Sequence, residues 1–276
     1  MKLQVLFFSF LTSIIAVNIL PQPICAQTIT TVAGCGIGND SLATKAELIY
    51  PMKVAFDNAG NSYIADQDNA MIRKVDASGV ITTFAGNGNE GYSGDGGPAT
   101  AATFINIYSV AVDKLGNVYI ADAGYSTTGS VIRKVNTSGI ISTFAGTGPP
   151  GYNGDSIAAT TAQLNGPSDL AIDTSGNIYI CDRYNSRVRE VSNSGIITTV
   201  PGAVGLPGVP FRIALDKKGN LFMATYSGDF ILKDSAGAVT NIAGTGSYGY
   251  SGDGGPATAA TFSAPCGLAL DTMNNV

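Results

Sequence analysis

One motif recurs along this chain, and its recurrence limits the possible folds more than any other feature. Each copy joins a short apolar run, an Asp-x-x-Gly-Asn turn signal or a close variant, and a second apolar run. The copies are FDNAGNSYIAD (56–66), VDKLGNVYIAD (112–122), IDTSGNIYICD (172–182), LDKKGNLFMAT (215–225) and the shorter LDTMNNV (270–276). Their leading aspartates lie 56, 60, 43 and 55 residues apart. Such periods indicate a repeat architecture in which each repeat is one supersecondary unit.

The segments within one repeat predict four short antiparallel strands. Apolar runs such as VAVD and LAID are typical of strands buried on both faces. The Asp-x-x-Gly-Asn segment predicts a hairpin, because Asp caps the turn and Gly or Asn adopts positive φ with little strain. Two further strands are expected in runs such as MIRKV and ITTFA, which a Ser-Gly turn separates. We therefore expect an all-β fold, a β-propeller of four-stranded antiparallel blades.

These residues resemble the NHL-repeat family of β-propellers, in particular its secreted bacterial type. The resemblance rests on P-x-x-V-A-x-D, G-N-x-Y-I-A-D, D-x-x-N-x-x-[IV]-R and a closing T-x-x-G, and it covers nearly all of residues 28–276. The third element is complete in the first and third blades, is interrupted by residues 124–130 in the second, and has Thr225 in place of its aspartate in the fourth. The Asn-His pair that names the family is absent, because the chain has no histidine.

The order of the repeats predicts how many blades are present. TITTVA (28–33) is interpreted as the last strand of a blade that closes the ring, and four full blades follow it. A fifth blade begins near the end of the chain. We expect residues 27–276 to form the incomplete propeller of a longer protein, six-bladed when complete.

Residues 1–26 are predicted to be a signal peptide. Lys2 precedes an apolar run from Val5 to Leu20, and Ala26 is the expected last residue before cleavage. An uncleaved anchor is the alternative, but the run is shorter than the ~20 residues that a membrane span needs. The mature protein is therefore expected in a secreted, periplasmic or cell-surface location without a membrane span. A net charge of −5 and the lack of any Lys/Arg cluster argue against a nucleic-acid partner.

The stretch GYSGDGGPATAATF occurs twice, at 91–104 and 249–262, after a Gly-x-Gly-x-x-Gly string. A dinucleotide site is disfavoured, because such a site needs a βαβ context and a helix that begins at the glycines. We interpret these segments as connectors between blades, with a single helical turn after Pro98 or Pro256. Calcium is the alternative ligand, for which the candidate residues are Asp95, Asp155 and Asp253.

Loops that enter the inner strands and loops that leave the second strands are expected to share one rim. Variable residues at the start of the inner strands are candidate binding residues, namely Lys53, Tyr108, Ser109, Ser168, Asp169, Phe211 and Arg212. Loop tyrosines are candidate contacts as well, because they provide area and a hydroxyl at modest entropy. These are Tyr92, Tyr125, Tyr152, Tyr184, Tyr226, Tyr248 and Tyr250.

Two functions remain open. The first is an extracellular binding or interaction scaffold that contacts a protein or glycan through this rim. The second is a calcium-dependent, lactonase-like hydrolase or a lyase with its site in the central channel, which the resemblance implies for related propellers. The sequence favours the first, because it has no histidine, no Gly-x-Ser-x-Gly elbow and no convergent carboxylates. No catalytic residue and no cofactor is therefore assigned.

Overall fold

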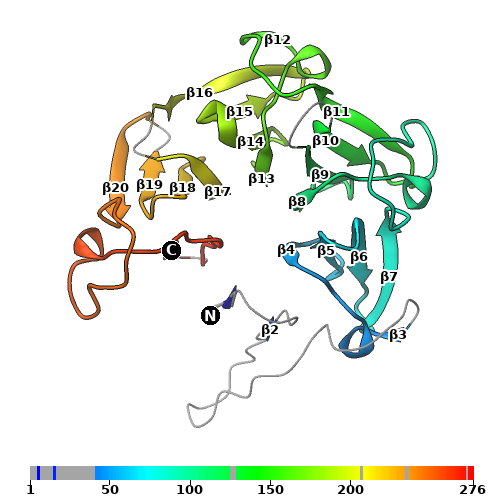
Figure 1. The fold of residues 1–276 in the computed structure, drawn as a ribbon, viewed down its shortest axis with the longest axis horizontal. Helices are drawn as coiled ribbons and strands as arrows, with labels where there is room; N and C mark the ends of the chain where they lie inside the picture. Colours follow the sequence, from blue (N-terminus) through cyan, green and yellow to red (C-terminus); the bar gives the residue numbers. More distant parts are fainter. Residues whose placement is uncertain are drawn as a thin grey trace.

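Four antiparallel sheets follow one another around a common centre (Figure 1). The computed structural model describes residues 41–276 except 125–128, 206–207, 234–235 and 272, together with the two-residue strands β1 (Val5–Leu6) and β2 (Ile15–Ala16). TITTVA and most of the predicted signal segment therefore lie outside the described residues. The expected all-β propeller of four-stranded blades is confirmed.

Each blade runs from an inner strand at the centre of the ring to an outer strand at its circumference. Blade I contains β4 (Pro51–Phe56), β5 (Ser62–Asp66), β6 (Met71–Val75) and β7 (Val80–Ala85). Blade II contains β8 (Ile107–Val112), β9 (Val118–Ala123), β10 (Ser130–Val135) and β11 (Ile141–Gly148). Blade III contains β13 (Pro167–Ile172), β14 (Ile178–Asp182), β15 (Arg187–Val191) and β16 (Ile196–Val204). Blade IV contains β17 (Pro210–Leu215), β18 (Leu221–Thr225), β19 (Phe230–Lys233) and β20 (Val239–Ala243).

The repeated Asp-x-x-Gly-Asn segment forms the predicted hairpin turn in every blade. In blade II, the Asp113 carboxylate accepts hydrogen bonds from the backbone N–H groups of Leu115 (2.9 Å) and Asn117 (2.8 Å) and from the Asn117 side chain (2.7 Å). Gly116 has a φ of 87°, which a residue with a side chain adopts only with strain. The turn thus fixes the register of the two innermost strands.

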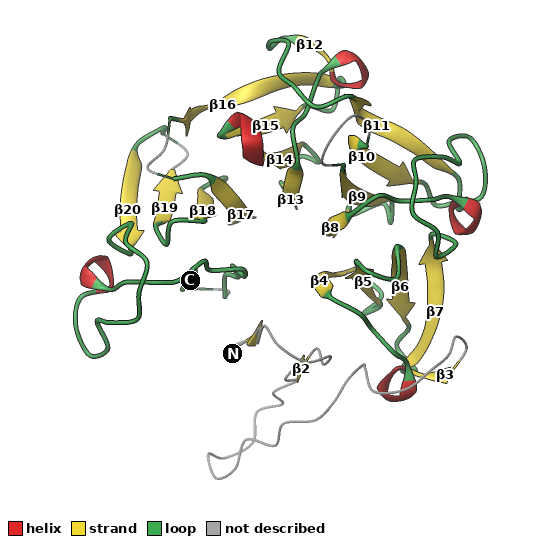
Figure 2. Cartoon of the chain, in the orientation of Figure 1, coloured by secondary structure: helices red, strands yellow, loops and turns green. Residues whose placement is uncertain are grey.

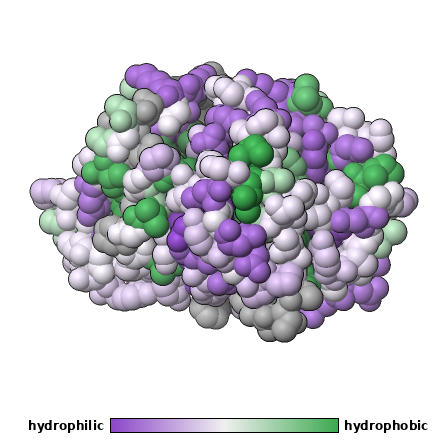
Figure 3. Space-filling view, turned by 90° about the horizontal axis from the view of Figure 1, so that it is seen from above, coloured by the Kyte–Doolittle hydropathy of each residue, from purple (hydrophilic) through white to green (hydrophobic). Residues whose placement is uncertain are grey.

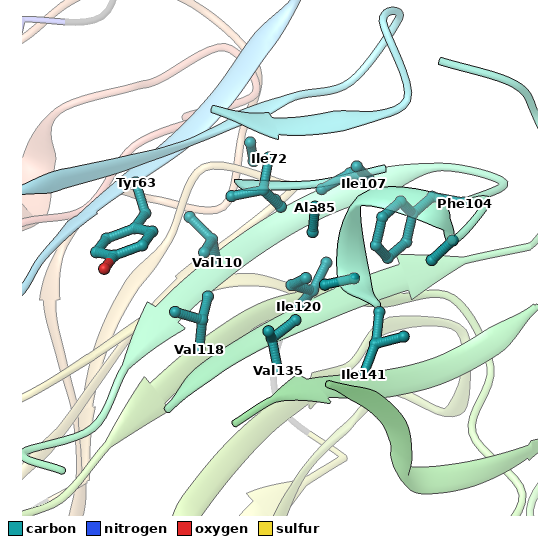
Figure 4. Close-up of a cluster of buried hydrophobic side chains, with 13 residues drawn as sticks. Tyr63, Ile72, Ala85, Phe104, Ile107, Val110, Val118, Ile120, Val135 and Ile141 are labelled. Atoms are coloured by element: carbon teal, nitrogen blue, oxygen red, sulfur yellow. The ribbon is translucent and has the colours of Figure 1, made fainter. Parts of the chain in front are cut away.

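The hydrophobic core lies between neighbouring sheets rather than inside any one of them. Figure 4 shows this for blades I and II, where Tyr63 and Ile72 face Val110 and Ile120 of the next sheet. Tyr63 also meets Phe84 edge-on, with ring centroids 4.9 Å apart. One inner strand departs from the expected burial, because β4 is only half-buried and lies at an open end of the ring.

The connectors run along the outer strand of the blade that follows them. After β7, the chain continues to Ala99, whose carbonyl accepts a hydrogen bond from Gly86 N–H. It then pairs with β11, since Gly96 donates to Ile141 O and Ile141 donates to Gly97 O. The predicted helical turn is a three-residue 3-10 helix, η2 (Ala99–Ala101) (Figure 2). Similar turns are η1 (Ala43–Lys45), η3 (Ala159–Thr161) and η5 (Ala257–Ala259).

An ion pair fixes the connector to the blade it precedes. Asp95 lies 2.6 Å from the guanidinium of Arg133, a β10 residue whose side chain is fully buried. The second oxygen of Asp95 accepts hydrogen bonds from the backbone N–H and the hydroxyl of Thr143 on β11. Blade III repeats this arrangement with Asp155 and Arg189 at 3.0 Å. We call each such pair a connector clasp.

Blade IV lacks the clasp, and three sequence differences coincide there. Its linker is short, because β16 ends at Val204 and β17 begins at Pro210. Ile231 occupies the register position that Arg133 occupies in blade II, opposite Met223 instead of Ile120. Thr225 replaces the aspartate that ends the second strand. An arginine occupies this position in blades I to III, as Arg73, Arg133 and Arg189, and each of them has a carboxylate within 4 Å. In blade IV an apolar residue replaces it, as expected where a buried charge would have no partner.

The surface seen edge-on is mixed in character (Figure 3). Hydrophobic side chains form small green patches between hydrophilic ones. In the described ranges every helix is a short 3-10 turn, and none is long and apolar enough to cross a membrane.

The two identical connectors provide an internal control for the clasp. Asp95→Ala should lower the free energy of unfolding by about 1 to 3 kcal/mol, because it leaves the Arg133 guanidinium buried without its ion pair. Asp253→Ala, in the same sequence context, should have little effect, because the only side chain bonded to Asp253 among the described residues is that of exposed Tyr250. Urea unfolding followed by circular dichroism measures both. Equal losses for the two variants would contradict this role of Asp95.

Candidate functional site

The expected shared rim is present on one face of the ring. In each blade the turn after the second strand lies against the segment that leads into the inner strand. Backbone N–H groups of the turn donate to carbonyls of that segment, as in Tyr184 to Asn165 (3.0 Å) and Tyr226 to Val209 (2.9 Å). We call this face the linker-side rim.

Buried aspartates hold the linker-side rim together in blades I to III. Asp122 accepts hydrogen bonds from the N–H groups of Ile105 and Asn106 at 2.9 Å, while its other oxygen is buried without a partner in the described structure. Burial raises the pKa of Asp122 to about 7, against the opposing effects of these N–H groups and of Arg133. Burial likewise raises the pKa of Asp182 to about 6, although Asn185, Asn165 and Arg189 act in the opposite direction.

The predicted channel-mouth residues bind one another across the inner strands. Asp169 is buried and accepts hydrogen bonds from Lys53 of blade I, from the Ser109 hydroxyl of blade II (2.8 Å) and from the Ile213 N–H of blade IV (2.8 Å). Lys53 donates also to the carbonyl of Leu170. The structure therefore brings Lys53, Ser109 and Asp169 together, and their polar groups brace four neighbouring blades.

Arg212 extends this bracing to the C-terminal segment. It donates to the carbonyl of Ser168 (2.7 Å) and to that of Cys266 (2.8 Å), and its side chain is buried. Ser168 in turn donates its hydroxyl to the carbonyl of Phe211 (3.1 Å). The hydrogen-bonding capacity of these predicted site residues is therefore directed largely at the protein itself.

An aromatic cluster surrounds Arg183 on the linker-side rim of blades III and IV. The guanidinium carbon lies 4.8 Å from the ring centroids of Tyr184 and Phe211 and 5.3 Å from that of Tyr226. Tyr226 meets both Phe211 and Tyr248 edge-on. We call Arg183, Tyr184, Phe211, Tyr226 and Tyr248 the Arg183 cluster. Its three tyrosines are exposed, so the cluster presents aromatic surface to solvent.

The local fold determines where these rings lie. Arg183 and Tyr184 belong to the 3-10 turn η4 (Arg183–Asn185), which Asp182 and Asn185 close through a 2.8 Å hydrogen bond. Gly166 passes directly beneath Tyr184, and a Cβ there would approach within 2.5 Å of the ring. Tyr108 of blade II lies nearby; burial raises its pKa, and the charges of Arg183 and Arg212 oppose that shift.

Arg183 has no acidic partner among the residues that the structure describes. Its Nε is buried without a hydrogen bond, and the described residues offer it neither an ion pair nor a hydrogen-bond acceptor. The rings of Tyr184, Phe211 and Tyr226 are the main groups that stabilise its charge. Each cation–π contact contributes about 0.5 to 2 kcal/mol. Sequence analysis named the three tyrosines but missed Arg183. The sequence feature that could have indicated Arg183 is a basic residue at the start of RYNSR (183–187), where the equivalent turn of blade I, QDNAM (67–71), has Gln67.

The other predicted tyrosines lie on connectors at the circumference, apart from the channel mouth. Tyr92 bonds Thr143 and covers the Arg133 guanidinium at 5.0 Å. Tyr152 covers Arg187 at 3.7 Å and bonds Asp155. Tyr250 bonds only Asp253 among the described residues. Tyr125 lies outside the described residues.

The candidate calcium ligands do not converge. Asp95 and Asp155 bind arginines of the blades that follow them, and Asp253 bonds Tyr250. Across the described part of the chain, no three Asp, Glu, His or Cys side chains are grouped as a metal ion would require.

The raised pKa values predict an unusual pH dependence. Asp122 and Asp182 have a higher pKa in the folded protein than the ordinary 3.8, so the folded state binds protons between about pH 4 and pH 7 that the unfolded state does not. The free energy of unfolding should therefore rise by roughly 3 to 4 kcal/mol as the pH falls from 8 to 5. Asp122→Asn should remove more than half of this rise, measured by thermal unfolding at several pH values.

Asp76→Asn serves as the matched control. Asp76 is an exposed turn aspartate whose pKa is lowered, first by the Ser78 hydroxyl and then by the Val80 N–H. Its contribution is lost only as the pH falls below about 4, so its variant should keep the wild-type slope between pH 8 and 5. A wild-type protein that loses stability over that interval would refute the raised pKa of Asp122.

Known proteins with related sequences and folds were compared with this chain. The teneurin NHL domain profile matches residues 30–91 and 87–149, and the NHL repeat profile matches residues 164–190. Teneurin-4 of Mus musculus is 31% identical over 163 residues, which is 52% of this chain and 6% of that protein. Teneurin-3 of Danio rerio is 35% identical over 127 residues, 41% of this chain and 4% of that protein. The chain thus matches less than a tenth of the length of these relatives.

Solved structures share the architecture. A protein with a proposed gluconolactonase activity superposes with a TM-score of 0.50 at 12% identity, covering 78% of this chain and 66% of that one. At this identity the likeness shows the fold alone. The family profiles, the teneurin relatives and the ring of four-stranded sheets agree with the motifs of the sequence. The chain belongs to the NHL-repeat family of β-propellers.

Proposed function

We propose that this chain is a secreted or cell-surface interaction module whose linker-side rim binds a protein or glycan partner. The Arg183 cluster is the observation that carries the proposal. Exposed tyrosines grouped around an arginine match the composition of binding hot spots, in which Tyr, Trp and Arg predominate. Support for the location comes from the export pattern of residues 1–26.

The geometry of the cluster suits recognition of a partner surface. Tyr184, Tyr226 and Tyr248 come from a turn of blade III, a turn of blade IV and a connector, so one partner would contact three separate segments. Their rings are held by stacking on Arg183 and by edge-on contacts, and such ordering lowers the entropy lost on binding. Tyrosine hydroxyls and ring faces serve protein and sugar partners alike.

The channel mouth is less suited to ligand binding than the cluster. Asp169, Ser109 and Arg212 are buried and hydrogen-bonded to neighbouring strands. A ligand there would have to break contacts that join adjacent blades. Arg183 stacks on the rings of Phe211 and Tyr226 but makes no ion pair with the described residues, so an acidic group of a partner can pair with it directly.

Binding screens with the purified chain test this function. A glycan array and a pull-down from extracellular protein should each be probed, and every hit measured again with Tyr226→Ala and Arg183→Met. Both substitutions should weaken binding by at least about tenfold, since hot-spot truncations typically remove that much affinity. Biolayer interferometry gives the dissociation constants.

Tyr250→Ala is the matched control. Tyr250 is more exposed than the tyrosines of the Arg183 cluster, but it has no aromatic or cationic neighbour in the described structure. Its removal should therefore leave the affinity for the partner unchanged. An equal loss for Tyr250→Ala would move the site to the connectors. Empty results from both screens would count against the interaction module itself.

A further inference from the structure

A cavity of about 610 Å³ lies on the face opposite the linker-side rim. It opens between blades II and III, at the Asp-x-x-Gly-Asn turns, and extends to the corresponding turn of blade IV. The repeated turns form its walls, and the Arg183 cluster has no part in it. Its volume falls within the range of ~300 to 1,000 Å³ that is typical of small-molecule sites.

The cavity has an apolar floor. Val112, Ile172 and Leu215, the last residues of three inner strands, line it together with Phe144 of β11. All four side chains are half-buried, so their apolar surface remains partly open to solvent. Phe144 packs edge-on against Tyr119 at 5.0 Å, which holds both rings in place. A ligand with an apolar body would be stabilised by covering this apolar surface.

The carboxylates that line this cavity already accept hydrogen bonds from the protein. Asp113 accepts four hydrogen bonds, two from backbone N–H groups, one from Asn117 and one from the Tyr119 hydroxyl. Asp216 likewise accepts four, and Asp173 accepts three. Their lone pairs are directed mostly into their own turns, and Asp216 also accepts from Asn274, so they are poor acceptors for a ligand.

The basic groups are less committed. Lys114 makes one hydrogen bond, to the carbonyl of Thr174 (2.7 Å), and Lys134 lies over the Tyr119 ring at 5.4 Å. Lys217 makes no hydrogen bond and no ion pair within the described ranges, and it is exposed at the edge of the cavity. An ammonium group offers three donors, so the polar groups that remain available are mainly cationic donors.

We propose that this cavity binds a small organic anion, with its apolar body on the Val112–Phe144–Ile172–Leu215 floor and its carboxylate, sulfonate or phosphate group toward Lys217. Charge-assisted hydrogen bonds from lysine would orient the anion. This site is independent of the linker-side rim, because it uses different turns on the opposite face. Loss of either site would leave the other intact.

Binding of 2-naphthoate and of its neutral counterpart 2-naphthamide tests the proposal. In titrations of the 15N-labelled full chain followed by NMR, 2-naphthoate should shift backbone amides of the turns at Leu115, Ser175 and Lys217. The amide should bind at least about threefold more weakly, because it lacks the charge that lysine recognises. Added salt should weaken the acid more than the amide.

Adjacent lysines supply a matched pair of variants. Lys217→Gln should weaken 2-naphthoate binding by about threefold or more. Lys218→Gln removes an equal charge from the same turn but does not line the cavity, so it should leave the affinity unchanged. Equal affinity for acid and amide, equal effects of the two variants, or shifts confined to the linker-side rim would each overturn the proposal. So would the absence of any shift at millimolar ligand.

Discussion

The connector clasp is the interaction that joins blades II and III to the loops that precede them. A fully buried arginine on the third strand can be tolerated only if a carboxylate reaches it, and that carboxylate comes from the loop that precedes the same blade. Asp95 and Asp155 therefore fix the connectors that precede blades II and III along an outer strand. Blade IV shows the reciprocal case, in which a short linker coincides with an apolar Ile231.

With the connectors held at the circumference, the two faces of the ring carry different chemistry. On the linker-side rim, buried aspartates such as Asp182 close the turns that present the Arg183 cluster. On the opposite face, turn aspartates such as Asp113 satisfy their own hairpins and leave lysines as the available polar groups. The same residue type thus shapes both faces.

Much of the fold could be predicted because its determinants are local. The Asp-x-x-Gly-Asn turns, the four strands of each blade and the single helical turn of the connector all depend on residues a few positions apart. The site was less predictable. Candidates such as Asp169 and Arg212 proved to brace the inner strands, because their partners are contributed by other blades. Arg183 was missed, since its aromatic neighbours Phe211 and Tyr226 are more than 25 positions away in sequence.

The sequence by itself determined the repeat, the turn chemistry and hence the propeller of four-stranded blades. It also determined that the duplicated glycine-rich stretch joins blades instead of cradling a phosphate. Only the tertiary structure decided that Asp95 pairs with Arg133, that two tyrosines and Phe211 surround Arg183, and that lysines line a cavity on the opposite face. The physical reason is distance along the chain: local turns are encoded by neighbouring residues, whereas charge pairing and aromatic stacking join residues that only the packing of the sheets around one centre brings together.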